Sequence, residues 1–126
     1  MSAFQSNTFS GDLGLQQQVH FLVIRMTKSF FLWIGDDSKM FSTLSVGMPP
    51  FLGSPEAVSS KLIWGQQGTL SQTISQKLAK KTACQVFVSV SLSFCEKETE
   101  LGLLRRILEE MKIHPEYFYE PSEQAA

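Results

Sequence analysis

Residues 19–34 read Val-His-Phe-Leu-Val-Ile-Arg-Met-Thr-Lys-Ser-Phe-Phe-Leu-Trp-Ile, two apolar runs separated by a short polar turn. Successive side chains of a strand point to opposite faces. In the first run one face carries Val19, Phe21 and Val23, and the other carries His20, Leu22, Ile24 and Met26. In the second run Phe30, Leu32 and Ile34 share one face, and Phe31 and Trp33 share the other. An antiparallel sheet with one face in water alternates apolar and polar side chains, so this hairpin predicts a sheet that needs cover on both faces.

The composition is that of a small globular domain. The chain has 126 residues, of which 43% are hydrophobic and 18% are charged, and its net charge is -1. This length predicts a single domain, which we assign to residues 1–118, with residues 119–126 as a C-terminal tail. A chain of this size buries about two thirds of its unfolded surface, enough for a core without disulfides. The near-neutral charge gives no electrostatic attraction to nucleic acid or to a membrane surface.

The sequence predicts a cytosolic or nuclear protein. Arg25 and the polar turn at residues 27–29 interrupt the longest apolar run, which falls short of the roughly 20 residues of a membrane helix. The N-terminal residues lack the basic-then-apolar pattern of a secretory signal. Cys84 and Cys95 flank one predicted strand, which holds them roughly 35 Å apart, whereas a disulfide needs Cα atoms within about 7 Å. We therefore expect both cysteines to be reduced.

Periodicity divides the chain into several strands, a helix, one long strand and a second helix. Strands are predicted within the first 17 residues and at about 17–26, 29–35, 41–48, 60–64 and 85–94. Helices are predicted from about residue 69 and over about 97–112. Their apolar stripes consist of Leu70, Ile74 and Leu78 in the first helix, and of Leu101, Leu104, Leu108 and Met111 in the second.

This order of elements favours an α+β fold, an antiparallel five- to six-stranded sheet with two helices on one face. Two helices lying side by side, about 8–10 Å apart, cover one face of such a sheet and leave the other face bare. We expect this second face to pair with a partner subunit. Alternation alone does not tell which set of side chains meets the helices and which meets the partner.

No motif in the sequence predicts a catalytic, cofactor or metal site. His20 and His114 are the only histidines, and neither has metal-ligand spacing with the cysteines. Residues 65–69 precede a helix but lack the lysine of a phosphate-binding loop. No local arrangement joins a nucleophile, a base and an orienting acid. We therefore expect that the protein is not an enzyme and carries no cofactor or metal.

Three interpretations account for the apolar second face. A closed barrel hides both faces of its sheet and would bind or transform a small ligand in a pocket lined by His20, Arg25 and Trp33. A homodimeric scaffold buries the same face against a second copy of itself. A subunit of a hetero-complex buries Phe31, Trp33 and Phe87 against another chain, since aromatic side chains are enriched in interface cores.

Three separated segments carry a resemblance to a known family. Residues 18–35 look like the signature hairpin of the proteasome assembly chaperone 4 family. Residues 78–82 (Leu-Ala-Lys-Lys-Thr) and 85–89 (Gln-Val-Phe-Val-Ser) are similar to the helix-to-strand join of that family. Residues 109–112 (Glu-Glu-Met-Lys) and 114–118 (His-Pro-Glu-Tyr-Phe) are similar to its ending. The resemblance spans about residues 8–118 in the same order, whereas residues 36–65 match poorly.

The resemblance implies a non-enzymatic chaperone without catalytic residues. Members of this family pair with a related subunit, proteasome assembly chaperone 3, as a heterodimer. The pair binds alpha-type subunits of the proteasome core, promotes assembly of the alpha ring and then dissociates. We expect a partner interface formed by Phe31, Trp33, Phe87, His20 and Leu22, and contacts with an alpha-type subunit in the loops at 36–42 and 49–59. Without its partner, the isolated chain is expected to self-associate, to aggregate or to be obtained in poor yield.

Overall fold

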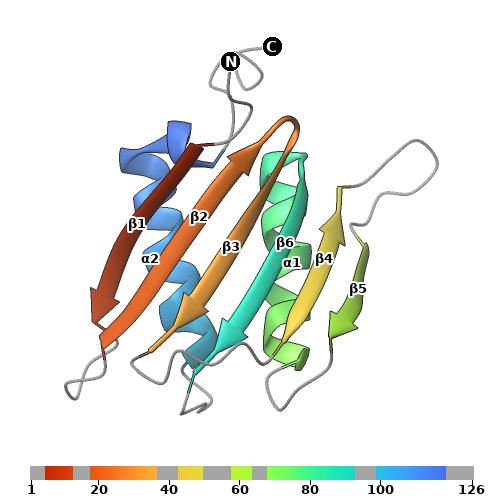
Figure 1. The fold of residues 1–126 in the computed structure, drawn as a ribbon, viewed down its shortest axis with the longest axis horizontal. Helices are drawn as coiled ribbons and strands as arrows, with labels where there is room; N and C mark the ends of the chain where they lie inside the picture. The colour runs from red at the N-terminus through yellow and green to blue at the C-terminus, as the bar shows by residue number, and fades with distance from the viewer. Residues whose placement is uncertain are drawn as a thin grey trace.

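The computed structural model describes residues 5–12, 18–36, 43–49, 58–63, 68–92 and 99–118. Within these ranges the chain forms one β-sheet, two α-helices and a short 3-10 helix (Figure 1). The strands are β1 (Gln5–Asp12), β2 (Gln18–Met26), β3 (Ser29–Gly35), β4 (Leu44–Met48), β5 (Val58–Ile63) and β6 (Gln85–Ser91). The helices are α1 (Gly68–Thr82), α2 (Thr99–Ile113) and the 3-10 helix η1 (Pro115–Tyr117). Each predicted strand and helix has a counterpart, including the strand expected within the first 17 residues.

The strands form one mixed sheet in the order β1-β2-β3-β6-β4-β5. Neighbouring strands are antiparallel except β3 and β6, which run parallel. The parallel pair arises because α1 carries the chain back along the sheet after β5, so that β6 enters between β3 and β4 in the direction of β3 (Figure 1). The predicted α+β class with six strands and two helices is confirmed, and the expected all-antiparallel pairing differs from the structure at this one pair.

The sheet is open, with β1 and β5 as its two edges. The closed barrel, one of the alternatives, is therefore wrong. Both helices lie on the same face of the sheet: in Figure 1, α2 lies behind β1 and β2, and α1 lies behind β6 and β4. The expectation that the helices share one face is confirmed, and neither α-helix covers the opposite face.

The core lies between the sheet and the two helices. Its sheet side consists of Val19, Phe21, Val23, Phe30, Leu32, Ile34, Val86, Val88 and Val90. Its helix side consists mainly of Leu70, Ile74, Leu78, Leu103, Leu104, Ile107 and Met111. The structure thus settles which side chains of the 19–34 hairpin point inward. Trp33 and Phe31 belong to the opposite face.

Small residues let α1 approach β4 closely. A Cβ atom on Gly47 would collide with the backbone carbonyl group of Ser75 on the helix. Two residues earlier on β4 and one turn earlier on α1, the buried hydroxyl groups of Ser45 and Ser71 lie 2.8 Å apart, at hydrogen-bonding distance. These close contacts between glycine and serine residues hold β4 against α1. The predicted apolar stripe of α1, which consists of Leu70, Ile74 and Leu78, is buried as well.

The buried stripe of α2 differs from the prediction. Leu104 and Met111 are buried as expected, but Leu101 is 60% exposed and Leu108 is 39% exposed. The side chains that are buried instead include Leu103, Ile107 and Glu110. Leucines occur all around this helix, so that two different stripes fit the helical period. Glu110 made the buried stripe hard to predict, because a carboxylate is seldom buried without a cationic partner.

Other sequence expectations fall on single residues or on segments outside the described ranges. Cys84 is buried and is not part of a disulfide, and its thiol donates a hydrogen bond to the backbone oxygen of Thr82 at 3.4 Å. Cys95 and the expected tail at residues 119–126 lie outside the described residues. Among the helices that the structure describes, none is long and apolar enough to cross a membrane.

Candidate interaction surface

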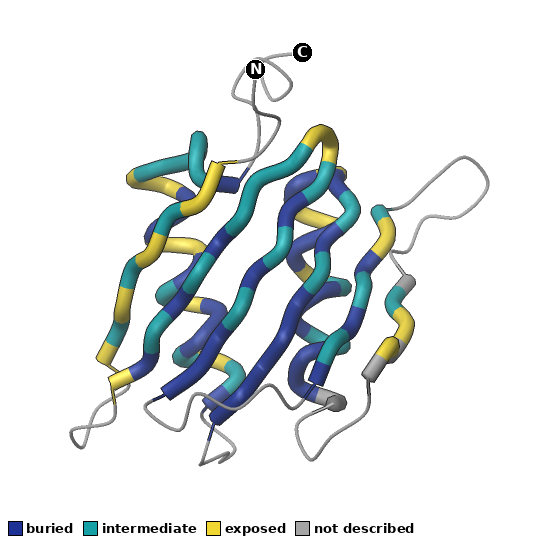
Figure 2. The backbone as a smooth tube through the Cα atoms, viewed as in Figure 1, coloured by how far each residue is buried: buried dark blue, intermediate teal, exposed yellow. Residues whose placement is uncertain are grey.

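The face of the sheet opposite the helices, named here the open face, carries the second set of apolar side chains. Its central residues are His20, Leu22, Ile24, Phe31, Trp33, Phe87 and Val46. All of them are half-buried, whereas most of their neighbours along the same strands are buried. Figure 2 shows this alternation as dark blue and teal segments along β2 and β3. No charged side chain lies among these central residues, and depletion of charge is a property of interface cores.

Strand register aligns these side chains in rows across the sheet. The longest row, followed from β2 to β4, consists of Ile24, Phe31, Phe87 and Val46. Side chains that stand directly opposite each other on one face of paired strands are neighbours on that face. The row is therefore a continuous apolar band over four strands. A shorter row beside it pairs Leu22 with Trp33.

The indole ring of Trp33 lies over the backbone of Gly35. A Cβ atom on Gly35 would collide with the indole atoms Cζ2 and Cη2. Gly35 is itself buried and is the register partner of His20 on β2. Because residue 35 has no side chain, the indole can cover the sheet and present an aromatic surface above it.

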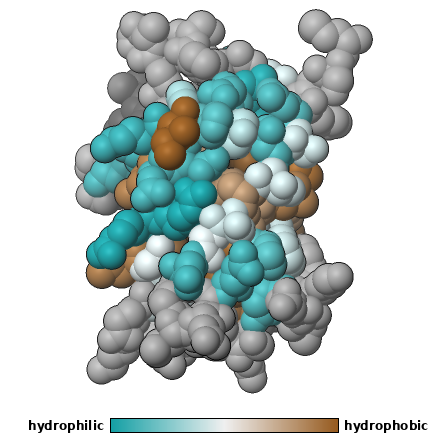
Figure 3. All heavy atoms as spheres, turned by 90° about the vertical axis from the view of Figure 1, so that its left-hand side faces the viewer, coloured by the Kyte–Doolittle hydropathy of each residue, from teal (hydrophilic) through white to brown (hydrophobic). Residues whose placement is uncertain are grey.

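Strand β1 gives the open face a polar margin. Its exposed side chains on this face are Ser6, Thr8, Ser10 and Asp12. A hollow of about 570 Å³ lies at this margin, lined by His20, Leu22 and Trp33 together with Thr8, Ser10, Phe9 and Phe21. Figure 3 views the molecule from the β1 side and shows that hydrophilic residues dominate this edge. An apolar centre beside a polar rim is the usual anatomy of a protein–protein interface.

The structure brings the five predicted interface residues together. Phe31, Trp33, Phe87, His20 and Leu22 all lie on the open face and are all half-buried. It does not form the ligand pocket that the barrel alternative required. Arg25 lies on the helix side of the sheet, where its Nη1 atom donates a hydrogen bond to the backbone oxygen of Glu116 at 2.8 Å. His20 and Trp33 lie on the other side of the sheet.

The second histidine belongs to a cluster around η1, at the end of α2. The Nδ1 atom of His114 lies 3.0 Å from a carboxylate oxygen of Glu116, and the imidazole stacks on the ring of Tyr117 with centroids 4.4 Å apart. A hydrogen bond from its own backbone amide, and next the contact with His114, lower the pKa of the Glu116 carboxyl group. These contacts are local to η1, whereas the bond from Arg25 to the backbone oxygen of Glu116 joins η1 to β2. Within the described part of the chain, no three His, Cys, Asp or Glu side chains gather as a metal site would require.

The residues of the open face that the interface prediction omits include Ile24, Val46 and Gly35. Ile24 and Val46 could have been predicted from the sequence, because strand alternation places them on one face with Leu22 and Phe87 once the strands are paired. Gly35 carries no such signal, because the position of the indole above it is a tertiary contact. Most of the two loops expected to contact an alpha-type subunit, residues 37–42 and 50–57, lies outside the described residues.

Comparison with known proteins agrees with this architecture. Residues 18–92 match the family model described as proteasome assembly chaperone 4. The chain is 40% identical over 103 residues to proteasome assembly chaperone 4 of Mus musculus and of Homo sapiens, which covers 82% of this chain and 82% of each relative. A chain in the crystal structure of a novel chaperone complex for yeast 20S proteasome assembly has the same fold, with a TM-score of 0.66 and 14% identity, covering 86% of this chain and 96% of that chain. As its hairpin predicts, this chain belongs to the proteasome assembly chaperone 4 family.

Proposed function

We propose that this protein is a non-enzymatic chaperone subunit that pairs through its open face with a related chaperone chain. The pair then binds alpha-type subunits of the proteasome core, promotes assembly of the alpha ring and dissociates. Membership of the proteasome assembly chaperone 4 family supports the general role. The named relatives are assembly chaperones, and the chain with the same fold comes from a chaperone complex.

The observation that carries the proposal is the apolar band on the open face. Ile24, Phe31 and Phe87 stand in one row, and both helices lie on the opposite side of the sheet. Burying an apolar side chain of this size is worth roughly 1.5–3 kcal/mol. A row of such groups left in water would be costly for a domain whose total stability is about 5–15 kcal/mol. A partner that covers this face removes that cost.

The partner that fits best is a related subunit of the proteasome assembly chaperone 3 type. A chain with the same fold offers a second sheet with one bare face, and two such faces pack about 10 Å apart as in a β-sandwich. The resulting pair has helices on both outer sides. We expect the alpha-type subunit to bind a composite surface of this pair through a contact of moderate size, because a transient chaperone has to leave its client. We place this activity in the cytosol or nucleus.

The test is co-purification with matched variants. Phe87→Ser removes an aromatic side chain from the open face, and Leu101→Ser removes an apolar side chain that is 60% exposed on α2. Each variant is co-expressed with a tagged subunit of the proteasome assembly chaperone 3 type, and the captured chains are identified by mass spectrometry. We expect Phe87→Ser to lose the partner and Leu101→Ser to keep it. Equal capture of both variants would contradict pairing through the open face.

Homodimerisation through the same face is the second candidate, because a self-pair shows the same apolar surface. Native mass spectrometry of an equimolar mixture with the related subunit separates the two. Heterodimers that form at the expense of any self-pair support the proposal, whereas self-pairs that persist in the mixture favour the scaffold.

A further inference from the structure

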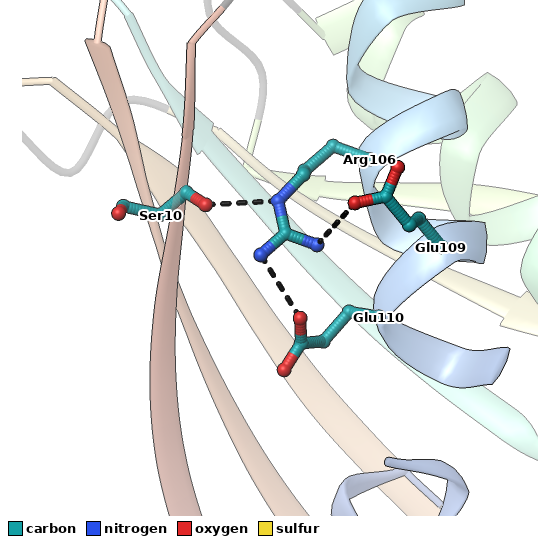
Figure 4. A network of polar contacts seen from close by, with 4 residues as sticks. All are labelled: Ser10, Arg106, Glu109 and Glu110. Atoms are coloured by element: carbon teal, nitrogen blue, oxygen red, sulfur yellow. Dashed lines mark hydrogen bonds and ion pairs between the residues drawn. The ribbon is translucent and has the colours of Figure 1, made fainter. Parts of the chain in front are cut away.

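One side chain of α2 binds the exposed edge of β1 (Figure 4). The Nε atom of Arg106 donates a hydrogen bond to the backbone oxygen of Ser10 at 2.8 Å. Its Nη2 atom lies 2.9 Å from Glu110, and its Nη1 atom lies 3.7 Å from Glu109. The guanidinium carbon lies 5.0 Å from the centroid of the Phe9 ring. A single arginine thus contacts the main chain of the edge strand, an aromatic ring of that strand and two acids of its own helix.

The position of this contact matters because β1 is an edge strand. An edge strand leaves the N–H and C=O groups of alternate residues without a strand partner, and a second chain can pair with them. The carbonyl group of Ser10, near the C-terminal end of β1, is occupied by Arg106. The bulky charged group stands where an added strand would have to lie.

The arrangement around Arg106 makes this closure hard to open. The Glu110 side chain is only 8% exposed, and Arg106 is its cationic partner. An incoming strand that takes the Ser10 carbonyl group displaces the guanidinium and leaves a buried carboxylate without its counter-charge, which is strongly unfavourable. Gly11 contributes space, since a Cβ atom at this position would lie 2.8 Å from Cγ of Arg106.

We propose that Arg106 closes the β1 edge against strand addition by another chain, and that it thereby directs association away from this edge. The opposite edge is held less tightly. There the amide of Gln72 contacts the backbone oxygen of Ser59 at 3.5 Å, and the Ser59 hydroxyl group contacts Gln76 at 3.4 Å. Both β1 and α2 lie outside residues 18–92, so the closure belongs to the part of the chain that the family model does not match.

The decisive comparison is Arg106→Ala against Arg105→Ala in the full-length chain. Both changes remove one arginine from the same turn of α2, but only the first removes the contact with Ser10. Light scattering over a series of protein concentrations gives the mass, and hydrogen exchange reports on the amides of residues 5–12. For Arg106→Ala we expect faster exchange of these amides in dilute solution, and protection together with rising mass as the concentration increases. Arg105→Ala should match the unmodified chain in both measurements.

A second variant keeps the test valid if Arg106→Ala does not fold. Gly11→Ala leaves all charges in place and pushes the stem of Arg106 away from the strand, so it should reproduce the concentration-dependent protection of β1. The proposal is overturned if a folded variant, Arg106→Ala or else Gly11→Ala, shows the same mass and β1 exchange as Arg105→Ala. It is also overturned if β1 exchanges faster without any gain of mass. Any association through the open face affects Arg106→Ala and Arg105→Ala alike, so the difference between these two variants reports on the β1 edge.

Discussion

The indole ring of Trp33 occupies the space that a side chain at Gly35 would need, so these two residues of β3 together set the height of the aromatic surface on the open face. The glycine leaves the backbone bare, and the indole covers it. Trp33 is half-buried because one side of its ring lies on the backbone of Gly35, and we propose that the partner subunit covers the other side.

Gly35→Ala is expected to lift the indole from the sheet. The added methyl group overlaps the ring, and such overpacking costs typically about 1–3 kcal/mol. In a Trp64→Phe background, which leaves Trp33 as the only tryptophan, the fluorescence emission should shift to longer wavelength as the ring meets water. Urea denaturation gives the loss of stability. Unchanged emission in the folded variant would mean that the ring does not lie over Gly35.

Trp33→Glu and Leu104→Glu separate the open face from the core. Trp33 is half-buried on the open face, whereas Leu104 is 8% exposed beneath the sheet. An unpaired carboxylate in the core is strongly destabilising. We therefore expect Leu104→Glu to lose most of its circular dichroism signal, while Trp33→Glu keeps the fold but no longer pairs with the related chaperone. Equal collapse of both variants would place Trp33 in the core of the fold.

Gly47→Ala is expected to destabilise the contact between β4 and α1. The new methyl group meets the backbone carbonyl group of Ser75, which can move only with its helix, and the expected loss is about 1–3 kcal/mol. Gly102→Ala is the matched control in the interior of α2, where replacing glycine should stabilise the helix by roughly 0.5–1 kcal/mol. Thermal unfolding should therefore shift in opposite directions for the two variants. A shift in the same direction would contradict the close approach at Gly47.

The pH dependence of the η1 segment should follow Glu116. Its pKa lies below the ordinary glutamate value, first because its own backbone amide binds the carboxylate and then because of His114. A lowered pKa in the folded state means that the contribution to stability is present above the ordinary value of 4.5 and is lost as the pH falls through the folded value. Titration of the side-chain carboxyl carbon by NMR measures this pKa. His114→Ala should raise it, and an unchanged titration would exclude His114 as a cause.

The sequence by itself determined much of the fold. Alternation in the 19–34 hairpin identified two sets of side chains correctly, because a strand sends consecutive residues to opposite faces whatever the strand packs against. The apolar stripe with Leu70 in α1 was equally readable. The same reasoning selected Phe31, Trp33 and Phe87 as a group, since residues that share a face in paired strands become neighbours without further information.

Only the tertiary structure decided which face the helices cover and where β6 enters the sheet. Those choices depend on contacts between residues far apart in the chain, such as Gly47 with Ser75 and Arg106 with Ser10. The stripe of α2 shows the same limit. Leu101 and Ile107 are equally suited to burial as amino acids, and the structure buries Ile107 on the side of α2 from which Arg106 reaches the backbone oxygen of Ser10 on β1. Local periodicity is a property of the backbone, whereas the choice between two equally apolar faces depends on what lies opposite each of them.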